Sequence, residues 1–224
     1  MGRACPFFMY IHSKAEIGKR ELDATDIPPP RIGPRFVIVA IGSSAGGLHA
    51  LSEVLSRLPR EFPSSVVVVQ HMHRERKSTL ASLLRRVTPL TVKEAEHGDA
   101  LAPGTVYIAP PDQHLLVGPG KLQLAHTQLI RFLRPSIDLM FESAAGTYGS
   151  RCIGVVLSGS LRDGAEGLRT IKEAGGTTIV ENPVEAEFKS MPQAALDTGC
   201  VDLIFPLPEI GPSLVALCAE EARK

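Results

Sequence analysis

A run of six apolar residues leading directly into a glycine-rich loop constrains the fold of this chain more than any other feature. Residues 36–41 read FVIVAI, and residues 42–47 read GSSAGG. A continuous apolar, β-branched run predicts a strand buried on both faces of a parallel sheet. Apolar residues then recur at helical spacing over residues 48–58, and Pro59 ends the pattern. The loop is therefore expected to join the carboxyl end of a buried strand to the start of a helix.

The rest of the chain repeats this alternation of strand and helix. Such a pattern predicts an α/β fold, namely a doubly wound, mostly parallel, Rossmann-like sheet with helices on both faces. Residues 115–117 and 122–124 flank Gly118-Pro119-Gly120 and predict one β-hairpin. The other expected strands are residues 66–69, 91–95, 105–109, 152–157, 177–180 and 201–205. The other expected helices are residues 76–87, a helix opened by Pro135 and Ser136, one ending at Gly175, residues 192–198 and one from Pro208.

The domain organisation follows from where this alternation begins. Residues 1–34 carry scattered charges and the triple proline at 28–30, which is typical of an extended spacer, so we interpret them as a tail or linker. Residues 35–224 form the expected domain. No stretch approaches the roughly 18 apolar residues of a spanning helix. A formal net charge of +0 and the absence of Trp argue against a nucleic-acid partner.

The four cysteines indicate a reducing compartment. No C-x-x-C spacing occurs, so neither a zinc site nor a redox pair is indicated. Cys152 and Cys200 accompany apolar runs and are expected to be inert core thiols. We therefore expect a cytoplasmic location.

Three interpretations fit the loop at residues 42–47. Its backbone N–H groups could bind phosphate at the helix start. It could be a tight turn with helix-capping serines. It also matches the nucleophile elbow G-x-S-x-G, with Ser44 between Gly42 and Gly46.

Polar residues at two further strand ends favour the third interpretation. His71 directly follows the second expected strand, and Asp163 follows residues 152–157 by a short loop. Parallel strands end at one edge of the sheet, so both side chains should share a crevice with Ser44. Singly, Ser44 or Asp163 could cap a helix and His71 could bond a carbonyl. Together they supply the nucleophile, the base and the orienting carboxylate of a serine hydrolase.

Nucleotide binding is the weaker alternative. The middle glycine of G-x-G-x-x-G is replaced by Ser44, and Gln70 and His71 stand where a ribose-binding carboxylate is needed. No G-K-[ST] follows, which excludes a P-loop. The order Ser, His, Asp also differs from the Ser, Asp, His order of α/β-hydrolases.

At this point the chain resembles the catalytic domain of CheB, the chemotaxis protein-glutamate methylesterase. The resemblance rests on residues 41–47 (IGSSAGG), 70–72 (QHM) and 157–164 (LSGSLRDG), in that order. It implies a serine hydrolase with Ser44 as nucleophile, His71 as base and Asp163 as orienting acid. The substrates it implies are glutamate methyl esters on the cytoplasmic helices of methylated chemoreceptors, with deamidation of receptor glutamines as a second activity. It implies no metal or organic cofactor and no insertion into the membrane.

The chain departs from the family pattern in three places. Ala45 stands where the family usually has Thr, and residues 160–162 (SLR) replace a more glycine-rich loop. Residues 1–34 are too few for the receiver domain that family members usually carry, so control by phosphorylation is not expected. The loop change motivates an alternative function, a non-catalytic receptor-binding signalling module of the same fold.

Overall fold

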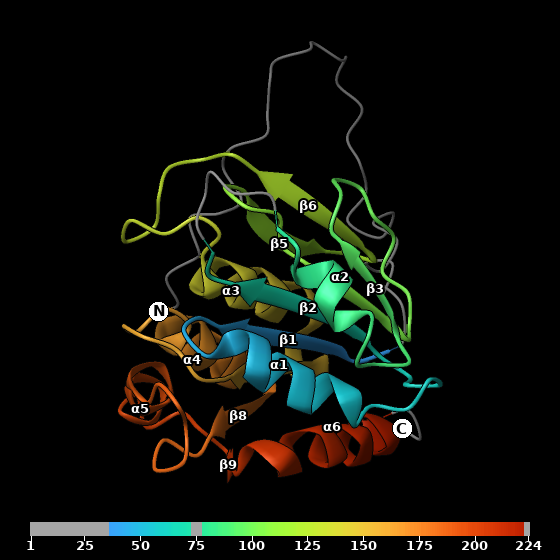
Figure 1. The fold of residues 1–224 in the computed structure, drawn as a ribbon. Coiled ribbons are helices and arrows are strands. Elements are labelled where there is room, and N and C mark those ends of the chain that lie inside the picture. The colour runs from blue at the N-terminus through green and yellow to red at the C-terminus, as the bar shows by residue number, and fades with distance from the viewer. Residues whose placement is uncertain (1–35, 73–77, 222–224) are drawn as a thin grey trace, which may run out of the picture. The chain divides into compact units, whose positions relative to one another are not determined.

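The computed structural model describes residues 36–72 and 78–221 (Figure 1). The chain divides into two units, Met1–Arg31 and Ile32–Lys224, and the described residues all belong to the second. The expected tail, residues 1–34, lies outside the described residues. Within them, no helix is both long enough and apolar enough to cross a bilayer.

A seven-stranded parallel sheet forms the centre of the described unit. Its strand order is β3-β4-β2-β1-β7-β8-β9, and every neighbouring pair is parallel. The strands are β1 (Ile38–Ser43), β2 (Ser65–Gln70), β3 (Thr91–Glu94), β4 (Thr105–Ile108), β7 (Cys152–Val156), β8 (Thr177–Glu181) and β9 (Leu203–Phe205). β1, β2 and β7 are buried along their whole length, as their continuous apolar runs predict.

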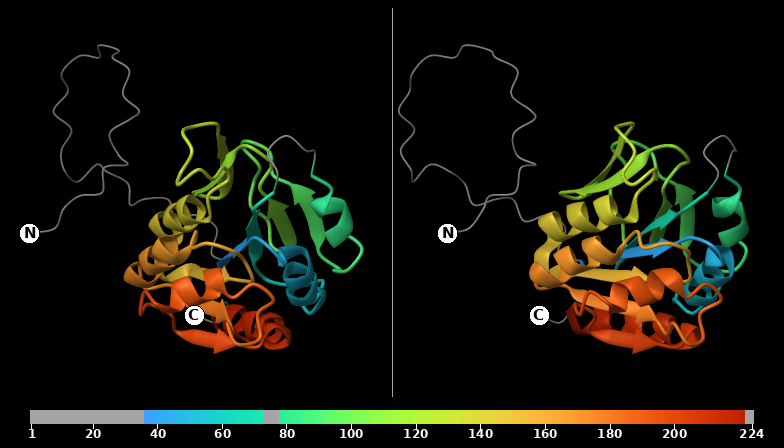
Figure 2. Two further views of the ribbon diagram at one scale, coloured as in Figure 1. Left: turned by 60° about the vertical axis from the view of Figure 1, so that its left-hand side comes forward. Right: turned by 90° about the vertical axis from the view of Figure 1, so that its left-hand side faces the viewer.

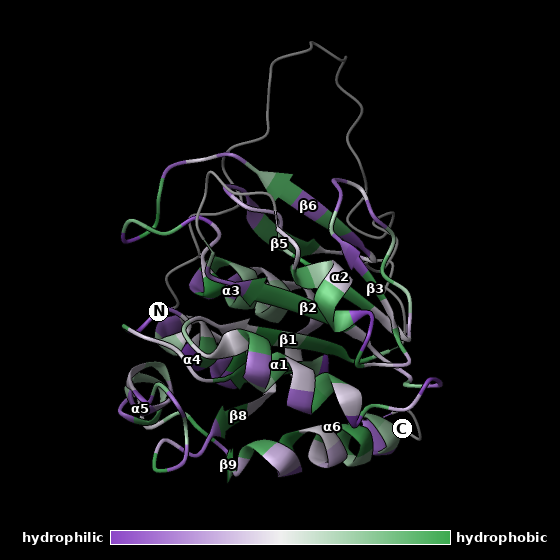
Figure 3. Cartoon of the chain, viewed as in Figure 1, coloured by the Kyte–Doolittle hydropathy of each residue, from purple (hydrophilic) through white to green (hydrophobic). Residues whose placement is uncertain are grey.

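Helices cover both faces of the sheet (Figures 1 and 2). One apolar core lies under α1 (Gly47–Ser56), α2 (Leu80–Leu84) and α6 (Leu207–Glu221), and the other under α3 (Ile137–Tyr148), α4 (Ala165–Glu173) and α5 (Ser190–Leu196). β1 shows why both faces are filled: Val39 and Ile41 belong to the first core, and Ile38 and Ala40 to the second. In Figure 3 the central strands β1 and β2 are accordingly hydrophobic throughout, whereas the outer helices carry both hydrophobic and hydrophilic residues. The predicted doubly wound α/β fold is confirmed.

The predicted hairpin is also present. β5 (His114–Gly118) and β6 (Lys121–Ala125) pair antiparallel as a separate two-stranded sheet. It is anchored to α3, because the Val117 N–H donates to Ser143 Oγ and Thr147 Oγ1 donates to the Val117 carbonyl. The hairpin thus extends the face of the domain that carries α3 (Figure 2).

The sequence misjudged the second helix. Apolar spacing predicts a helix over residues 76–87 with Leu80, Leu83, Leu84 and Val87 on one face. α2 is shorter, and of these four side chains Leu83 and Val87 are exposed; residues 76 and 77 lie outside the described part. After α2 the chain is tied to α1, where Thr88 Oγ1 donates to the Leu55 carbonyl over 2.7 Å and accepts the Leu90 N–H. Apolar spacing cannot reveal such a hydrogen bond in advance.

The cysteine expectation is half right. Cys152 is fully buried, and burial raises the pKa of its thiol to about 12, which keeps it in the unreactive protonated form. Cys200 is only partly buried, so the prediction that it is a core thiol is wrong. It follows α5 in the turn before β9, where its thiol lies 3.5 Å from the Thr198 carbonyl oxygen.

The strand order places the predicted site residues at one edge. β1 lies between β2 and β7, with Ser43 in register with Gln70 and Gly42 in register with Val156. The chain leaves β1 in one direction along the sheet and returns to its other side at β7. This reversal is the position at which open α/β sheets bind their ligands.

Candidate active site

The turn after β1 is shaped by glycines. Gly46 has a φ of 73°, a left-handed conformation that any side chain would strain. A Cβ at Gly42 would lie 2.4 Å from Ile137 Cγ2, and one at Gly47 would lie 1.8 Å from Gln70 Oε1. The turn that carries Ser44 therefore needs glycine at these places, of which the elbow motif predicts those at 42 and 46.

Hydrogen bonds tie this turn to the ends of β2 and β7. Ser43 Oγ donates to Gln70 Oε1 over 2.6 Å, and Gln70 Nε2 donates to the Ser44 carbonyl over 2.7 Å. The His71 N–H donates to the Ser43 carbonyl over 3.0 Å, and the Ser44 N–H donates to the Ser158 carbonyl over 3.1 Å. Ser44 is thus held between the loop that carries His71 and the loop that leads to Asp163.

His71 and Asp163 form a direct pair. The His71 Nε2–H donates to Asp163 Oδ2 over 2.9 Å, across 92 residues of sequence. The His71 side chain is 12% exposed and the Asp163 side chain 2%. Because Nε2 is engaged, Nδ1 is the ring nitrogen left to accept a proton. No hydrogen bond joins the Ser44 hydroxyl to the His71 ring within residues 36–72 and 78–221.

Asp163 does more than face His71. Its carboxylate accepts the N–H of Ile137 over 2.7 Å, the N–H of Asp138 over 3.1 Å and the hydroxyl of Ser136 over 3.1 Å. Burial alone would raise the pKa of Asp163, but the hydrogen bonds from His71 and from these two N–H groups hold it below the usual range. Asp163 therefore stays ionised, as a group that orients and stabilises an imidazolium must.

The single-residue interpretation of Asp163 as the cap of its own helix is wrong. The N-cap of α4 is Gly164, with a φ of 97° and no side-chain cap. Asp163 instead satisfies N–H groups at the start of α3. The helix dipole of α3 adds to the stabilisation of its negative charge.

Sequence reasoning missed His114 and gave no role to Ser136 beyond opening a helix. His114 is fully buried, and its Nδ1 accepts the Ser136 N–H over 3.2 Å while its Nε2–H donates to the Gln128 carbonyl. Burial lowers the pKa of His114 and favours this neutral form. In the sequence His114 is an isolated residue before the apolar run 115–117, and nothing there indicates that it binds Ser136. For the contact between Ser136 and Asp163, the sequence offered only the pair Pro135-Ser136, which predicts a helix start.

The acid loop, residues 157–164 after β7, carries Asp163 and is held by further hydrogen bonds. The Ser158 N–H donates to Glu181 Oε2 over 2.6 Å, and burial raises the pKa of Glu181. The Gly159 N–H donates to the Phe188 carbonyl, so it is not free to bind substrate. Across the described part of the chain, the N–H groups of Ala45 and Ser160 meet no acceptor. A Cβ at Gly159 would lie 3.0 Å from Ser44 Cβ, so Ser160 begins beside the elbow.

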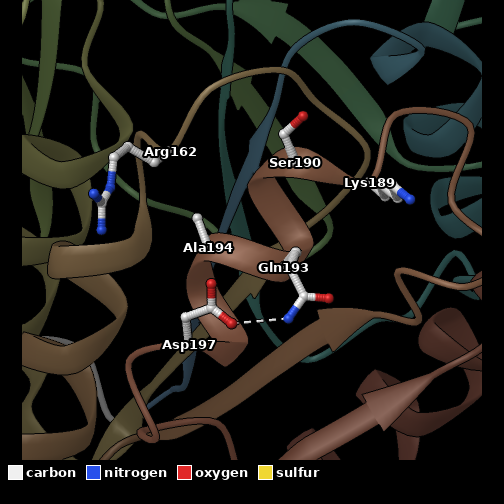
Figure 4. Close-up of a pocket in the computed structure, with 6 residues that line it drawn as sticks. All are labelled: Arg162, Lys189, Ser190, Gln193, Ala194 and Asp197. Atoms are coloured by element: carbon white, nitrogen blue, oxygen red, sulfur yellow. Dashed lines mark hydrogen bonds between the residues drawn. The ribbon is translucent and has the colours of Figure 1, made fainter.

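Two cavities border these loops. The first, of about 410 Å³, lies beside α5, and Figure 4 shows Arg162 and Lys189 pointing to opposite sides of that helix. The second, of about 570 Å³, is lined by Gly46, Ser158 and several glutamates. Ser44 and His71 line neither of these two cavities, and both residues are partly buried.

Known proteins with similar sequences come from one family. The family model "CheB methylesterase" matches residues 39–214. The chain is 44% identical to "Protein-glutamate methylesterase/protein-glutamine glutaminase 2" of Anaeromyxobacter dehalogenans, over 83% of this chain and 54% of that relative. It is 42% identical to "Protein-glutamate methylesterase FrzG" of Myxococcus xanthus, over 84% of this chain and 58% of that relative. The chain thus spans little more than half the length of these curated relatives.

A solved structure matches as well. The crystal structure of the Thermotoga maritima CheB methylesterase catalytic domain superposes with a TM-score of 0.78 at 39% identity. The match covers 81% of this chain and 98% of that domain. The two proteins are therefore similar in sequence as well as in fold.

Proposed function

Since the chain belongs to the CheB methylesterase family, we propose that it hydrolyses methyl esters of glutamate side chains on chemoreceptors, with Ser44 as nucleophile. The observation that carries this proposal is the 2.9 Å hydrogen bond between His71 and Asp163 beside the Ser44 elbow. A histidine held by an ionised carboxylate next to a partly buried serine turn is the arrangement that activates a hydroxyl.

In the first step Ser44 Oγ attacks the ester carbonyl carbon, and its proton passes to His71 Nδ1. Asp163 keeps the ring oriented and stabilises its positive charge through Nε2–H. The carbonyl oxygen becomes an oxyanion, and the N–H groups of Ala45 and Ser160 are the donors available to bind it. The tetrahedral intermediate then collapses, and methanol leaves with the proton from His71.

In the second step water hydrolyses the acyl-enzyme. His71 Nδ1 takes a proton from the water, which attacks the Ser44 ester and releases the glutamate carboxylic acid together with the free serine. A glutamine side chain can follow the same route, with ammonia in place of methanol as the leaving group. Deamidation of receptor glutamines is therefore part of the proposal.

The site suits a side chain presented by another protein. Ser44 is only partly buried and the His71 side chain is 12% exposed, so a reactive ester can approach both from the surface. A glutamate ester projecting from a receptor's cytoplasmic helix meets that need. We accordingly assign the chain to the cytoplasm, where such helices lie.

The test is methanol release from methylated receptor by the wild type, Ser44→Ala and Ser43→Ala. Ser44→Ala should lose activity by about 10³-fold or more, because triad residues act as a unit. Ser43→Ala, which removes only a neighbouring hydroxyl bonded to Gln70, should keep far more. A fluorophosphonate probe should label the wild type but not Ser44→Ala. An unlabelled, inactive wild type that still binds receptor would favour the non-catalytic alternative.

A further inference from the structure

Two carboxylates near the proposed triad hold each other's helices. Asp163, just before α4, accepts the N–H groups of Ile137 and Asp138 at the start of α3. Asp138, in the first turn of α3, accepts the N–H groups of Gly164 and Gly167 at the start of α4, over 2.9 and 2.8 Å. Both residues are almost fully buried, at 4% and 3% exposure. Each helix thus supplies the acceptor that the other helix start lacks.

The contact made by Asp138 lies next to Asp163 in the chain. Gly164 is the residue after Asp163, so Asp138 holds the peptide that joins them. Glycine is required for this approach: a Cβ at Gly167 would lie 2.8 Å from the Asp138 carbonyl oxygen and 2.9 Å from its Cα. At Gly164 the φ of 97° and Ile137 Cγ2, which would lie 2.8 Å from a Cβ, exclude a side chain. The start of α4 is therefore seated against α3 with little freedom.

We propose that Asp138 is a positioning residue, which fixes the first turn of α4 so that Asp163 faces His71. The kinetic part of this inference rests on the proposed function, and the structural part does not. Asp138 touches neither His71 nor any group that would meet substrate. It acts through the backbone on either side of the Asp163 side chain: N–H groups of α3 bind the carboxylate, and Asp138 binds the N–H groups that follow.

The charges around Asp138 explain why an amide can substitute for part of this role. Both N–H groups bind Oδ1, while Oδ2 lies 3.5 Å from Arg131 Nη1. The neighbouring acid is Asp163, with Glu142 farther along α3. His71 and His114 lie behind Asp163, bonded to it directly and through Ser136. Asp138→Asn would keep the Oδ1 acceptor and remove the negative charge. It therefore distinguishes the effect of the hydrogen bonds to α4 from the effect of the charge.

A purely structural cap would affect stability without a specific effect on the chemistry. The two interpretations therefore differ in which kinetic constant changes. Loss of positioning should lower kcat, because the histidine loses its orientation in the transition state, and should leave KM nearly unchanged. Loss of stability alone should lower the folded fraction and leave kcat per folded molecule intact.

The experiment compares Asp138→Ala, Asp138→Asn and the control Ser143→Ala. Ser143 is the control because its partly buried hydroxyl, also on α3, accepts the Val117 N–H of the hairpin and makes no contact with α4 through this bond. Per folded molecule, Asp138→Ala should lower kcat by about 10- to 100-fold, the loss expected from a misplacement near 1 Å. Asp138→Asn and Ser143→Ala should stay within about 3-fold of the wild type. Equal kcat values for Asp138→Ala and Ser143→Ala would overturn the proposal.

A second pair of variants guards against a failure of Asp138→Ala to fold. Gly167→Ala, in α4, places a methyl group against Asp138, whereas Gly146→Ala, in α3, meets no atom within 4 Å. Gly167→Ala should reproduce the loss of kcat, and Gly146→Ala should not. A folded Gly167→Ala protein with wild-type kcat would also overturn the proposal.

One readout needs no substrate. The proton between His71 Nε2 and Asp163 Oδ2 should give a downfield proton NMR resonance that is absent in Asp163→Ala. Asp138→Ala should broaden or shift it, and Ser143→Ala should leave it in place. An unchanged resonance in Asp138→Ala contradicts positioning even if the wild type is inactive. A changed resonance in a chain that releases no methanol supports positioning while the proposed function fails.

Discussion

The Gln70 side chain holds Ser44 by donating from Nε2 to the Ser44 carbonyl over 2.7 Å. Through Oε1 it also accepts the buried Ser43 hydroxyl, so one amide fixes both residues of the nucleophile turn. This relationship places a residue at the end of β2 in control of a loop that follows β1. It also suggests the first of five predictions.

Gln70→Leu should lower both stability and activity. The change leaves the Ser43 hydroxyl without its buried acceptor, which typically costs about 1–3 kcal/mol of the free energy of unfolding. The freed turn should also lower kcat by about 10-fold or more, because a displaced nucleophile attacks less often. Denaturant unfolding and methanol release measure the two effects. Gln123→Leu, at an exposed position of β6, is the control and should alter neither.

Asp163→Asn should abolish most of the activity while His71 remains in place. The amide cannot stabilise an imidazolium as a carboxylate does, and such changes cost about 10⁴-fold in kcat in a comparable triad. KM should change little, because Asp163 is buried away from substrate. Steady-state kinetics on methylated receptor decide this. Retention of more than a tenth of the wild-type kcat would show that Asp163 is not the orienting acid.

Asp138 should impose a pH dependence on stability. Burial, and then repulsion from Asp163, raise the pKa of Asp138 to about 6 against the N–H groups of Gly164 and Gly167, which lower it. The folded state therefore binds more protons than the unfolded state between about pH 4 and 6, so this contribution to stability falls as pH rises. The loss is on the order of 2–3 kcal/mol.

The comparison that isolates this effect is wild type against Asp138→Asn in urea unfolding from pH 4 to 7. The difference in free energy of unfolding should move against the wild type as pH rises to 6 and then level off. Asp163 acts in the opposite direction, since its pKa is lowered and its contribution is lost only as pH falls below the usual carboxyl range. A difference independent of pH would mean that folding does not shift the pKa of Asp138.

Gly46→Ala should damage the elbow more than strain alone explains. Its φ of 73° costs an alanine about 1–2 kcal/mol, and the new Cβ would lie 2.9 Å from both Ser158 Oγ and Glu187 Oε2. Gly98→Ala is the matched control, because its φ of 88° carries the same strain with no atom within 4 Å. Both variants should lose stability, and only Gly46→Ala should lose kcat. Equal kcat in the two would remove the elbow from the mechanism.

Arg162→Ala should leave the chemistry largely intact. The guanidinium lines the cavity beside α5 and forms no ion pair with the residues that the structure describes. We expect kcat within about 3-fold of the wild type, since an exposed charge contributes little to a buried pair. A loss of 10-fold or more would show that the altered acid loop acts on the reaction.

The parallel sheet and the single edge to which its strand ends bring Ser44, His71 and Asp163 could be predicted from the sequence, whereas the spatial order of the strands was not predicted. Apolar runs without alternation identify buried parallel strands, and such strands end on one side whatever their spacing in the chain. The hairpin was equally readable, because Gly118-Pro119-Gly120 interrupts two short apolar runs. The actual hydrogen-bonding role of Ser44 toward His71 is still a prediction.

The partners of the site residues could not be predicted. Asp163 caps α3 and not α4, because two helix starts meet only after the sheet has brought them together. His114 and Ser136 interact across 22 residues through one buried hydrogen bond. Periodicity reports which face of a helix is apolar, but it carries no information on which distant acceptor an N–H will meet. For the same reason it overestimated the length of α2.

Because β1 lies between β2 and β7, the proposed activity requires that the two halves of the sheet have assembled. β1 and β2 carry Ser44 and His71 near the beginning of the described unit, while β7 brings Asp163 only after the hairpin and α3 have been added. A polypeptide cut between β6 and α3 would leave the two contributions on separate pieces. If hydrolysis recovers when such pieces are mixed, β7 can pair with β1 without a covalent connection between the two halves.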